Sequence, residues 1–105
     1  MPVDKTGVAE RSKSALGLLI SSVCDTYQTT PEELRSTARL GHISRARWAL
    51  AFILVEDWGW SYLRVGKLIA KSHVAALLGY NNAKALMSYD GNFYQSIIEI
   101  REAVR

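Results

Sequence analysis

Cysteine, proline and long apolar runs are scarce in this 105-residue chain. Cys24 is the single cysteine, which excludes an intramolecular disulfide framework and fits a reducing compartment. The longest apolar run, residues 48–55, is far shorter than the roughly 20 residues that a membrane-spanning helix requires. Residues 1–7 form no hydrophobic signal region, and no proline follows Pro31. We therefore expect a cytoplasmic protein without a membrane segment.

The chain also lacks the residue sets that catalysis and metal binding require. Cys24, His42 and His73 show no ligand-like spacing, and no pair of nucleophile and base can be assembled. The phosphate-binding pattern Gly-x-x-x-x-Gly-Lys-Ser/Thr is missing, which argues against an ATP-driven motor. We expect no enzymatic activity, no metal and no cofactor.

The composition is that of an ordinary globular domain, with 49% hydrophobic and 22% charged residues. A chain of this length usually folds as one domain, so we expect a single domain over residues 1–105.

The net charge of +3 is unevenly distributed along the chain. The segment from Arg35 to Lys84 holds eight basic and two acidic residues, which gives it a net charge of +6. The flanks hold five basic and eight acidic residues, a net of −3. A basic block of this kind is typical of a nucleic-acid-binding face, although a solvated basic surface gives the same pattern.

The apolar spacing is helical throughout. A first helix over about 8–27 is predicted from one apolar stripe: Leu16, Leu19, Ile20, Val23 and Tyr27. Thr30, Pro31 and Glu33 form the start signal of a short helix that ends near Thr37. A last helix over about 92–105 follows the turn signal at Asp90 and Gly91.

Serine caps predict the three helices between these. Ser44 is expected to cap a helix that ends near Trp58, with Gly59 as its terminator. Because residues 48–55 are apolar on nearly every side, this helix is expected at the centre of the fold. Ser61 and Ser72 are expected to cap helices over about 62–69 and 73–88. The result is an all-α fold of about six helices, and the pair at 62–88 suggests a helix-turn-helix.

Three stretches, in order and at matching spacing, resemble a known family. They are Thr-Pro-Glu-Glu-Leu-Arg-Ser at 30–36, Ile-Ser-Arg-Ala-Arg-Trp-Ala at 43–49, and Arg-Val-Gly-Lys-Leu-Ile-Ala-Lys-Ser-His-Val-Ala-Ala-Leu at 64–77. From about residue 23 to 85 the chain resembles the C-terminal DNA-binding domain of the bacterial replication initiator DnaA. That domain is a helix-turn-helix of the Trp-repressor-like type. The initiator's nucleotide-binding motor has no counterpart here, so we expect a free-standing domain.

The resemblance implies roles for particular residues. Arg39 matches a loop arginine that enters the minor groove, and Arg45 and Arg47 match an Arg-x-Arg that positions the protein on phosphates. Lys71 and His73 match an Arg and a His at the start of the recognition helix. Residues on or before the two helices of the pair complete the expected DNA-binding set: Ser61, Arg64, Lys67, Ser72 and Val74. The alternatives are a solvated loop, or pairing of the arginines with Glu32, Glu33 or Asp57.

The base-reading positions depart from the family pattern. Ser72 stands where the family has Asp, and Val74 and Ala75 replace two hydroxyl residues. We expect a protein that binds double-stranded DNA and regulates transcription or replication, with altered base readout. The alternative is a protein-interaction adaptor that has lost specific DNA readout, because Val74, Ala75, Leu77 and Leu78 make the start of the recognition helix apolar. The flanking helices either close the core or form a homodimer or partner interface, and the sequence leaves both open.

Overall fold

The computed structural model describes residues 13–105, and they form six helices and no strand. The predicted all-α fold is therefore confirmed, while the predicted start of the first helix near residue 8 lies outside the described residues. In chain order the helices are α2 (Lys13–Tyr27), α3 (Pro31–Leu34), α4 (Gly41–Glu56), α5 (Tyr62–Leu68), α6 (His73–Tyr89) and α7 (Gly91–Ala103).

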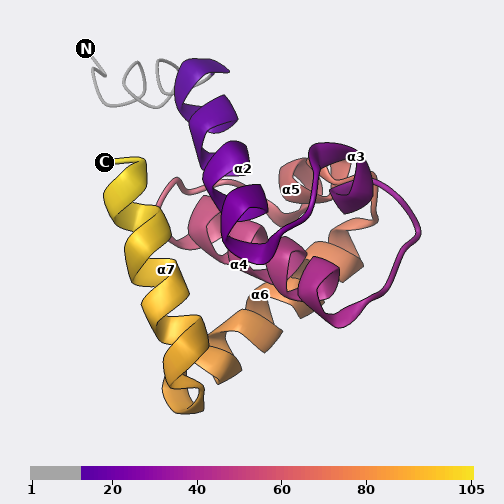
Figure 1. Cartoon of the computed structure of the whole chain (residues 1–105). Helices are drawn as coiled ribbons and strands as arrows, with labels where there is room; N and C mark the ends of the chain where they lie inside the picture. Colours follow the sequence, from indigo (N-terminus) through magenta and orange to yellow (C-terminus); the bar gives the residue numbers. More distant parts are fainter. Residues whose placement is uncertain (1–12) are drawn as a thin grey trace.

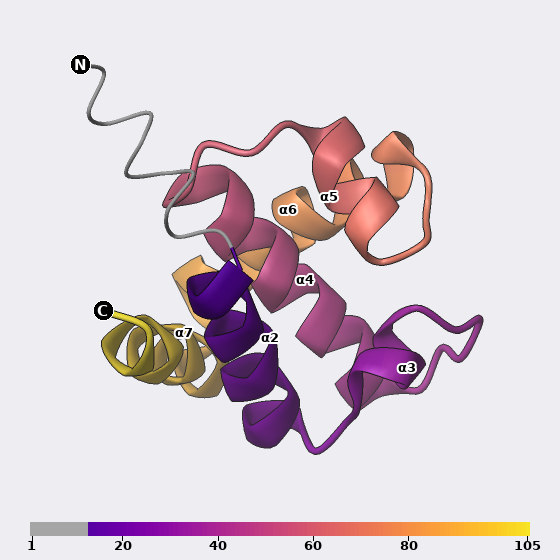
Figure 2. The same cartoon turned by 90° about the horizontal axis from the view of Figure 1, so that it is seen from above.

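Helix α4 is the centre of the fold, as its all-round apolar sequence predicts. It packs against every other described helix, with α2 on one side and α6 on the other (Figures 1 and 2). Its residues from Ala49 to Leu54 are all buried. The flanking helices α2 and α7 lie side by side and contribute buried Leu19, Val23, Ile97 and Ile100, so they close the core of this chain.

Three of the four predicted N-caps are confirmed. The Thr30 hydroxyl accepts a hydrogen bond from the Glu33 amide, and the Glu33 carboxylate accepts one from the Thr30 amide, which completes a capping box. Ser61 and Ser72 cap α5 and α6 by accepting hydrogen bonds from amides three residues later.

The prediction that Ser44 caps the central helix is wrong. Helix α4 begins at Gly41, and its N-cap residue Leu40 makes no side-chain hydrogen bond. The amides of Ile43 and Ser44 both bond to the Leu40 carbonyl, and the Ile43 side chain is buried. Burial of Ile43 in the core extends the helix beyond the residue that local capping chemistry favours. At the other end, Gly59 has φ +73° and lets the Trp60 amide reach the Leu54 carbonyl, as the predicted terminator requires.

A tight turn over residues 69–72 joins α5 to α6. Ala70 has φ +58°, and the Lys71 amide donates to the Gly66 carbonyl over 2.8 Å, closing the end of α5. A Cβ at Gly66 would lie 2.7 Å from the Ser72 carbonyl oxygen, so only glycine permits this approach. The turn therefore fixes the angle between the two helices by backbone contact.

Candidate nucleic-acid interface

The residues predicted to contact DNA lie in the segment before α4, within α4, and along the α5–α6 pair. Arg39 lies in the segment before α4, while Arg45 and Arg47 lie within that helix. The remaining seven follow one another through the α5–α6 pair: Ser61, Arg64, Lys67, Lys71, Ser72, His73 and Val74. Eight of the ten are exposed, whereas Lys71 is half-buried and Arg47 is buried.

Arg47 is a structural residue, which corrects its prediction as a phosphate contact. Its side chain is 9% exposed, and its guanidinium donates hydrogen bonds to four backbone carbonyls of the segment before α4. The acceptors, at 2.7 to 2.9 Å, are the carbonyl oxygens of Glu33, Leu34, Ser36 and Ala38. Four of its five N–H donors are thereby used inside the protein. Arg47 therefore holds the 33–38 segment against α4, and only one of its N–H donors remains for an external phosphate.

Lys71 supports the same segment from the turn. Its Nζ donates to the Ser36 carbonyl at 2.6 Å and, more weakly, to the Ile69 carbonyl at 3.4 Å. An ammonium has three donors, so one remains for an external acceptor. Burial lowers the pKa of the Lys71 ammonium, and three nearby guanidinium groups lower it further: Arg47, Arg39 and Arg35.

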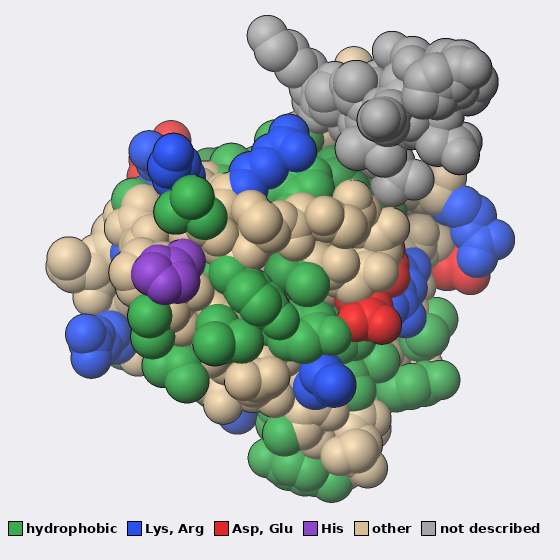
Figure 3. Space-filling view, turned by 180° about the vertical axis from the view of Figure 1, so that it is seen from behind, with side chains coloured by type: hydrophobic (Ala, Val, Ile, Leu, Met, Phe, Trp, Pro, Cys, Tyr) green, Lys and Arg blue, Asp and Glu red, His purple; other side chains and the backbone are tan. Residues whose placement is uncertain are grey.

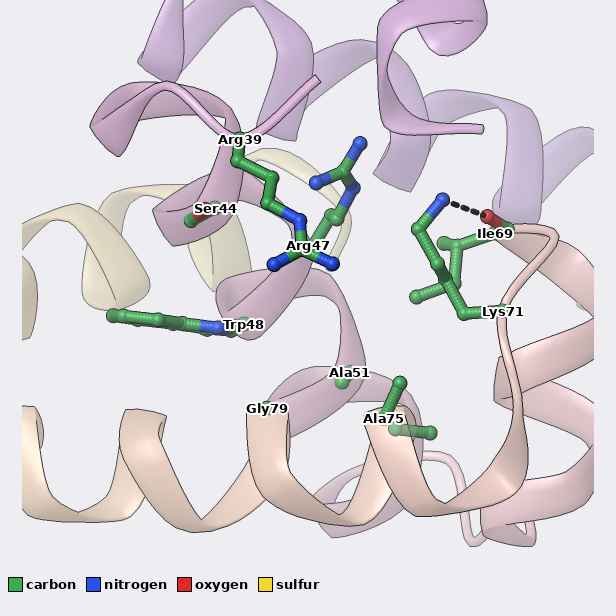
Figure 4. Close-up of a pocket in the computed structure, with 10 residues that line it drawn as sticks. Arg39, Ser44, Arg47, Trp48, Ala51, Ile69, Lys71, Ala75 and Gly79 are labelled. Atoms are coloured by element: carbon green, nitrogen blue, oxygen red, sulfur yellow. Dashed lines mark hydrogen bonds between the residues drawn. The ribbon is translucent and has the colours of Figure 1, made fainter. Parts of the chain in front are cut away.

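An open pocket of about 250 Å³ lies between the 35–40 segment, α4 and the start of α6. Figure 4 shows the Arg39 side chain extending into this pocket, with Lys71 opposite it and the indole of Trp48 below. Ser44 lines one wall, and Gly79 lies on the floor. None of the described residues that line the pocket is acidic. We call it the cationic pocket.

None of the three acidic residues expected as partners pairs with the loop arginines: Glu32 forms no ion pair within residues 13–105, and the other two are used elsewhere. Glu33 belongs to the capping box, and Asp57 forms an ion pair with Arg101 at 2.7 Å. Within residues 13–105, Arg39 and Arg45 make neither an ion pair nor a hydrogen bond. Their charges are therefore available to an external anion.

The remaining basic residues of the predicted set, Arg45, Arg64 and Lys67, lie outside the cationic pocket. Arg64 stacks on the Trp60 ring, with 3.8 Å from its Cζ to the ring centroid, and it stays exposed next to Lys67 on α5. Arg45 is not part of this group, because it lines a separate pocket with Tyr27 of α2 and Asp90 before α7. The structure thus brings Arg39 and Lys71 together at the cationic pocket, leaves Arg64 and Lys67 exposed on α5, and places Arg45 at a separate pocket.

Sequence reasoning missed three residues here. Arg35 donates to the Leu68 carbonyl at 2.7 Å and so ties the end of α3 to the end of α5. Ser44 and Trp48 line the cationic pocket, whereas the sequence suggested a cap for one and a core position for the other. The helical spacing of Ser44, Trp48 and Ala51 was the available signal, because it places them on one face of α4.

Comparisons with protein-family models find no match to this chain, and comparisons with curated proteins find no significant match. Within the described part of the chain, no group of three or more His, Cys, Asp and Glu side chains is placed to hold a metal. None of the helices from residue 13 onward has the length and apolar character needed to cross a membrane.

Proposed function

We propose that this chain binds double-stranded DNA through a helix-turn-helix formed by α5 and α6, in the manner of the DnaA C-terminal domain, and regulates transcription or replication. The observation that carries the proposal is the position of Arg39. Its guanidinium lies beside the start of α6 with no partner among residues 13–105. Lys71, Arg64 and Lys67 add positive charge along the same helix pair, as phosphate binding requires.

In this mode of binding each part of the site has its own task. The exposed start of α6, with His73 and Val74, enters the major groove. Arg64 and Lys67 on α5 lie over the phosphate backbone, and Arg39 reaches into the neighbouring minor groove. Arg47 contributes indirectly, because it fixes the segment that carries Arg39.

The base preference follows from the side chains at the start of α6. The Ser72 hydroxyl is engaged as the helix cap, accepting from the Ala75 amide at 3.1 Å. Val74 is 49% exposed and offers a methyl surface, which suits the methyl group of thymine better than a hydrogen-bonding base edge. A preference for thymine at the base pair that faces Val74 is therefore part of the proposal.

Titration of a labelled random-sequence duplex at several salt concentrations tests DNA binding. If about four to five phosphates are neutralised, log affinity should fall against log salt with a slope of about −4. Arg39→Ala should make this slope shallower by about one and weaken binding about five- to tenfold. Arg105→Ala, at the exposed C-terminal end, is the matched control and should change neither. Absence of binding at low salt would contradict the proposal.

One observation favours a protein-interaction adaptor as the second candidate. Val74 and Leu78, four residues apart on α6, are 49% and 56% exposed, and Leu63 on α5 is 55% exposed. Figure 3, which views the molecule from behind, shows hydrophobic side chains gathered on this face with basic side chains at its margins. Leu78→Lys separates the two candidates: DNA binding is expected to persist or strengthen with the added charge, whereas an apolar protein interface would be lost.

A further inference from the structure

The cationic pocket concentrates positive charge without an acidic residue to balance it. Arg39 enters it with no hydrogen-bond partner among residues 13–105, and the Lys71 ammonium keeps one donor after serving two carbonyls. Arg47 lies behind them with its charge held by carbonyls rather than by a carboxylate. Burial lowers the pKa of the Lys71 ammonium, and repulsion from the nearby Arg47 and Arg39 guanidinium groups lowers it further. An anion in the pocket would relieve that repulsion.

The walls supply donors from several directions. Figure 4 shows Arg39 descending from one side, Lys71 rising on the opposite side and Ser44 on the wall near Arg39. The Ser44 hydroxyl makes no hydrogen bond within the described residues. Below them, small residues of α6 such as Gly79 leave open a volume of about 250 Å³. A planar fork, an ammonium and a hydroxyl around one space suit a tetrahedral oxyanion.

We propose that the cationic pocket binds one phosphate group, held by Arg39, Lys71 and Ser44. Two sources carry this chemistry: a phosphodiester of the DNA backbone and the monoester of a free phosphorylated ligand. The first source rests on the proposed function, because a side chain at the minor groove and a helix in the major groove lie on the two sides of one sugar–phosphate strand. In that complex Arg39 contacts the phosphate of this strand at the edge of the minor groove, not a base. The pocket itself does not depend on DNA binding, since its donors converge in the chain alone.

An NMR titration with inorganic phosphate at constant ionic strength, with chloride as the balancing anion, tests the pocket. The indole resonance of Trp48, assigned with Trp48→Phe, should shift with saturation under phosphate and not under chloride. Arg39→Gln should weaken phosphate binding about tenfold, because one charge-assisted contact is lost. Arg105→Gln, which removes an exposed cation outside the pocket and outside the proposed DNA-binding residues, is the matched control and should leave the affinity unchanged.

Two further results identify the source of the phosphate group and test whether the pocket binds phosphate at all. Dimethyl phosphate that binds as well as inorganic phosphate indicates a backbone diester, whereas binding of inorganic phosphate alone indicates a free monoester. Equal shifts under chloride and phosphate, or equal losses of affinity in Arg39→Gln and Arg105→Gln, would overturn the proposal of a phosphate pocket. The duplex titration is read separately, so a chain that binds phosphate without DNA contradicts the proposed function and leaves the phosphate pocket in place.

Discussion

Replacement of Arg47 by alanine is expected to lower the free energy of unfolding by about 3–5 kcal/mol. Arg47 is 9% exposed and donates to four carbonyls of residues 33–38. Alanine removes all four charge-assisted hydrogen bonds and leaves carbonyls that are at least partly buried without donors. It also leaves a cavity between α4 and the 33–38 segment. Urea unfolding followed by circular dichroism gives the value directly.

Arg45 supplies the matched control for this measurement. It lies two residues earlier on the same helix, is exposed, and makes no hydrogen bond or ion pair within residues 13–105. Arg45→Ala should therefore change the stability by no more than about 0.5 kcal/mol. Arg47→Lys should recover only part of the loss, because one ammonium cannot match the spread of a guanidinium. A loss below about 1 kcal/mol in Arg47→Ala would show that water satisfies the freed carbonyls.

Arg45 and Arg47 have the same predicted role but different surroundings, and only part of this difference could be predicted from the sequence. The resemblance assigned both residues to phosphate contacts, since it matches residue types and not their surroundings. Helical geometry held a further signal: residue 47 is four positions after Ile43 and three before Leu50, both buried, whereas residue 45 lies on another side. The carbonyls that receive Arg47 belong to an irregular segment whose path no periodicity describes, so its partners could not be foreseen.

The helices themselves were largely predictable because their signals are local. Thr30, Ser61 and Ser72 each cap a helix through an amide three residues away, which short-range chemistry alone determines. The start of α4 could not be predicted from local signals, because burial of Ile43 is a tertiary effect that outweighs the capping preference of Ser44. The cationic pocket could not be predicted for the same reason, since it forms where residues 39–51 meet residues 69–79, which are distant in sequence.

Gly66→Ala is expected to destabilise the chain by about 2–3 kcal/mol and to weaken duplex binding more than this loss of folding explains. The added Cβ would lie 2.7 Å from the Ser72 carbonyl oxygen and 2.8 Å from that of Lys71. Both are backbone atoms, so no side-chain rotation relieves the overlap, and the 69–72 turn must move away from α5. That movement shifts the start of α6 and the Lys71 side chain together.

Gly17→Ala is the matched control, because Gly17 is an exposed residue of α2 whose added Cβ would meet nothing within 4 Å. It should stabilise the chain by about 0.5–1 kcal/mol through helix propensity, with duplex binding unchanged. Thermal unfolding and the duplex titration, run below the melting temperature of both variants, give the two readouts. If Gly66→Ala remained as stable as the unsubstituted chain, the turn would be pliable. The α5–α6 angle would then not be set by backbone contact, and the geometry that the proposed DNA binding requires would need another origin.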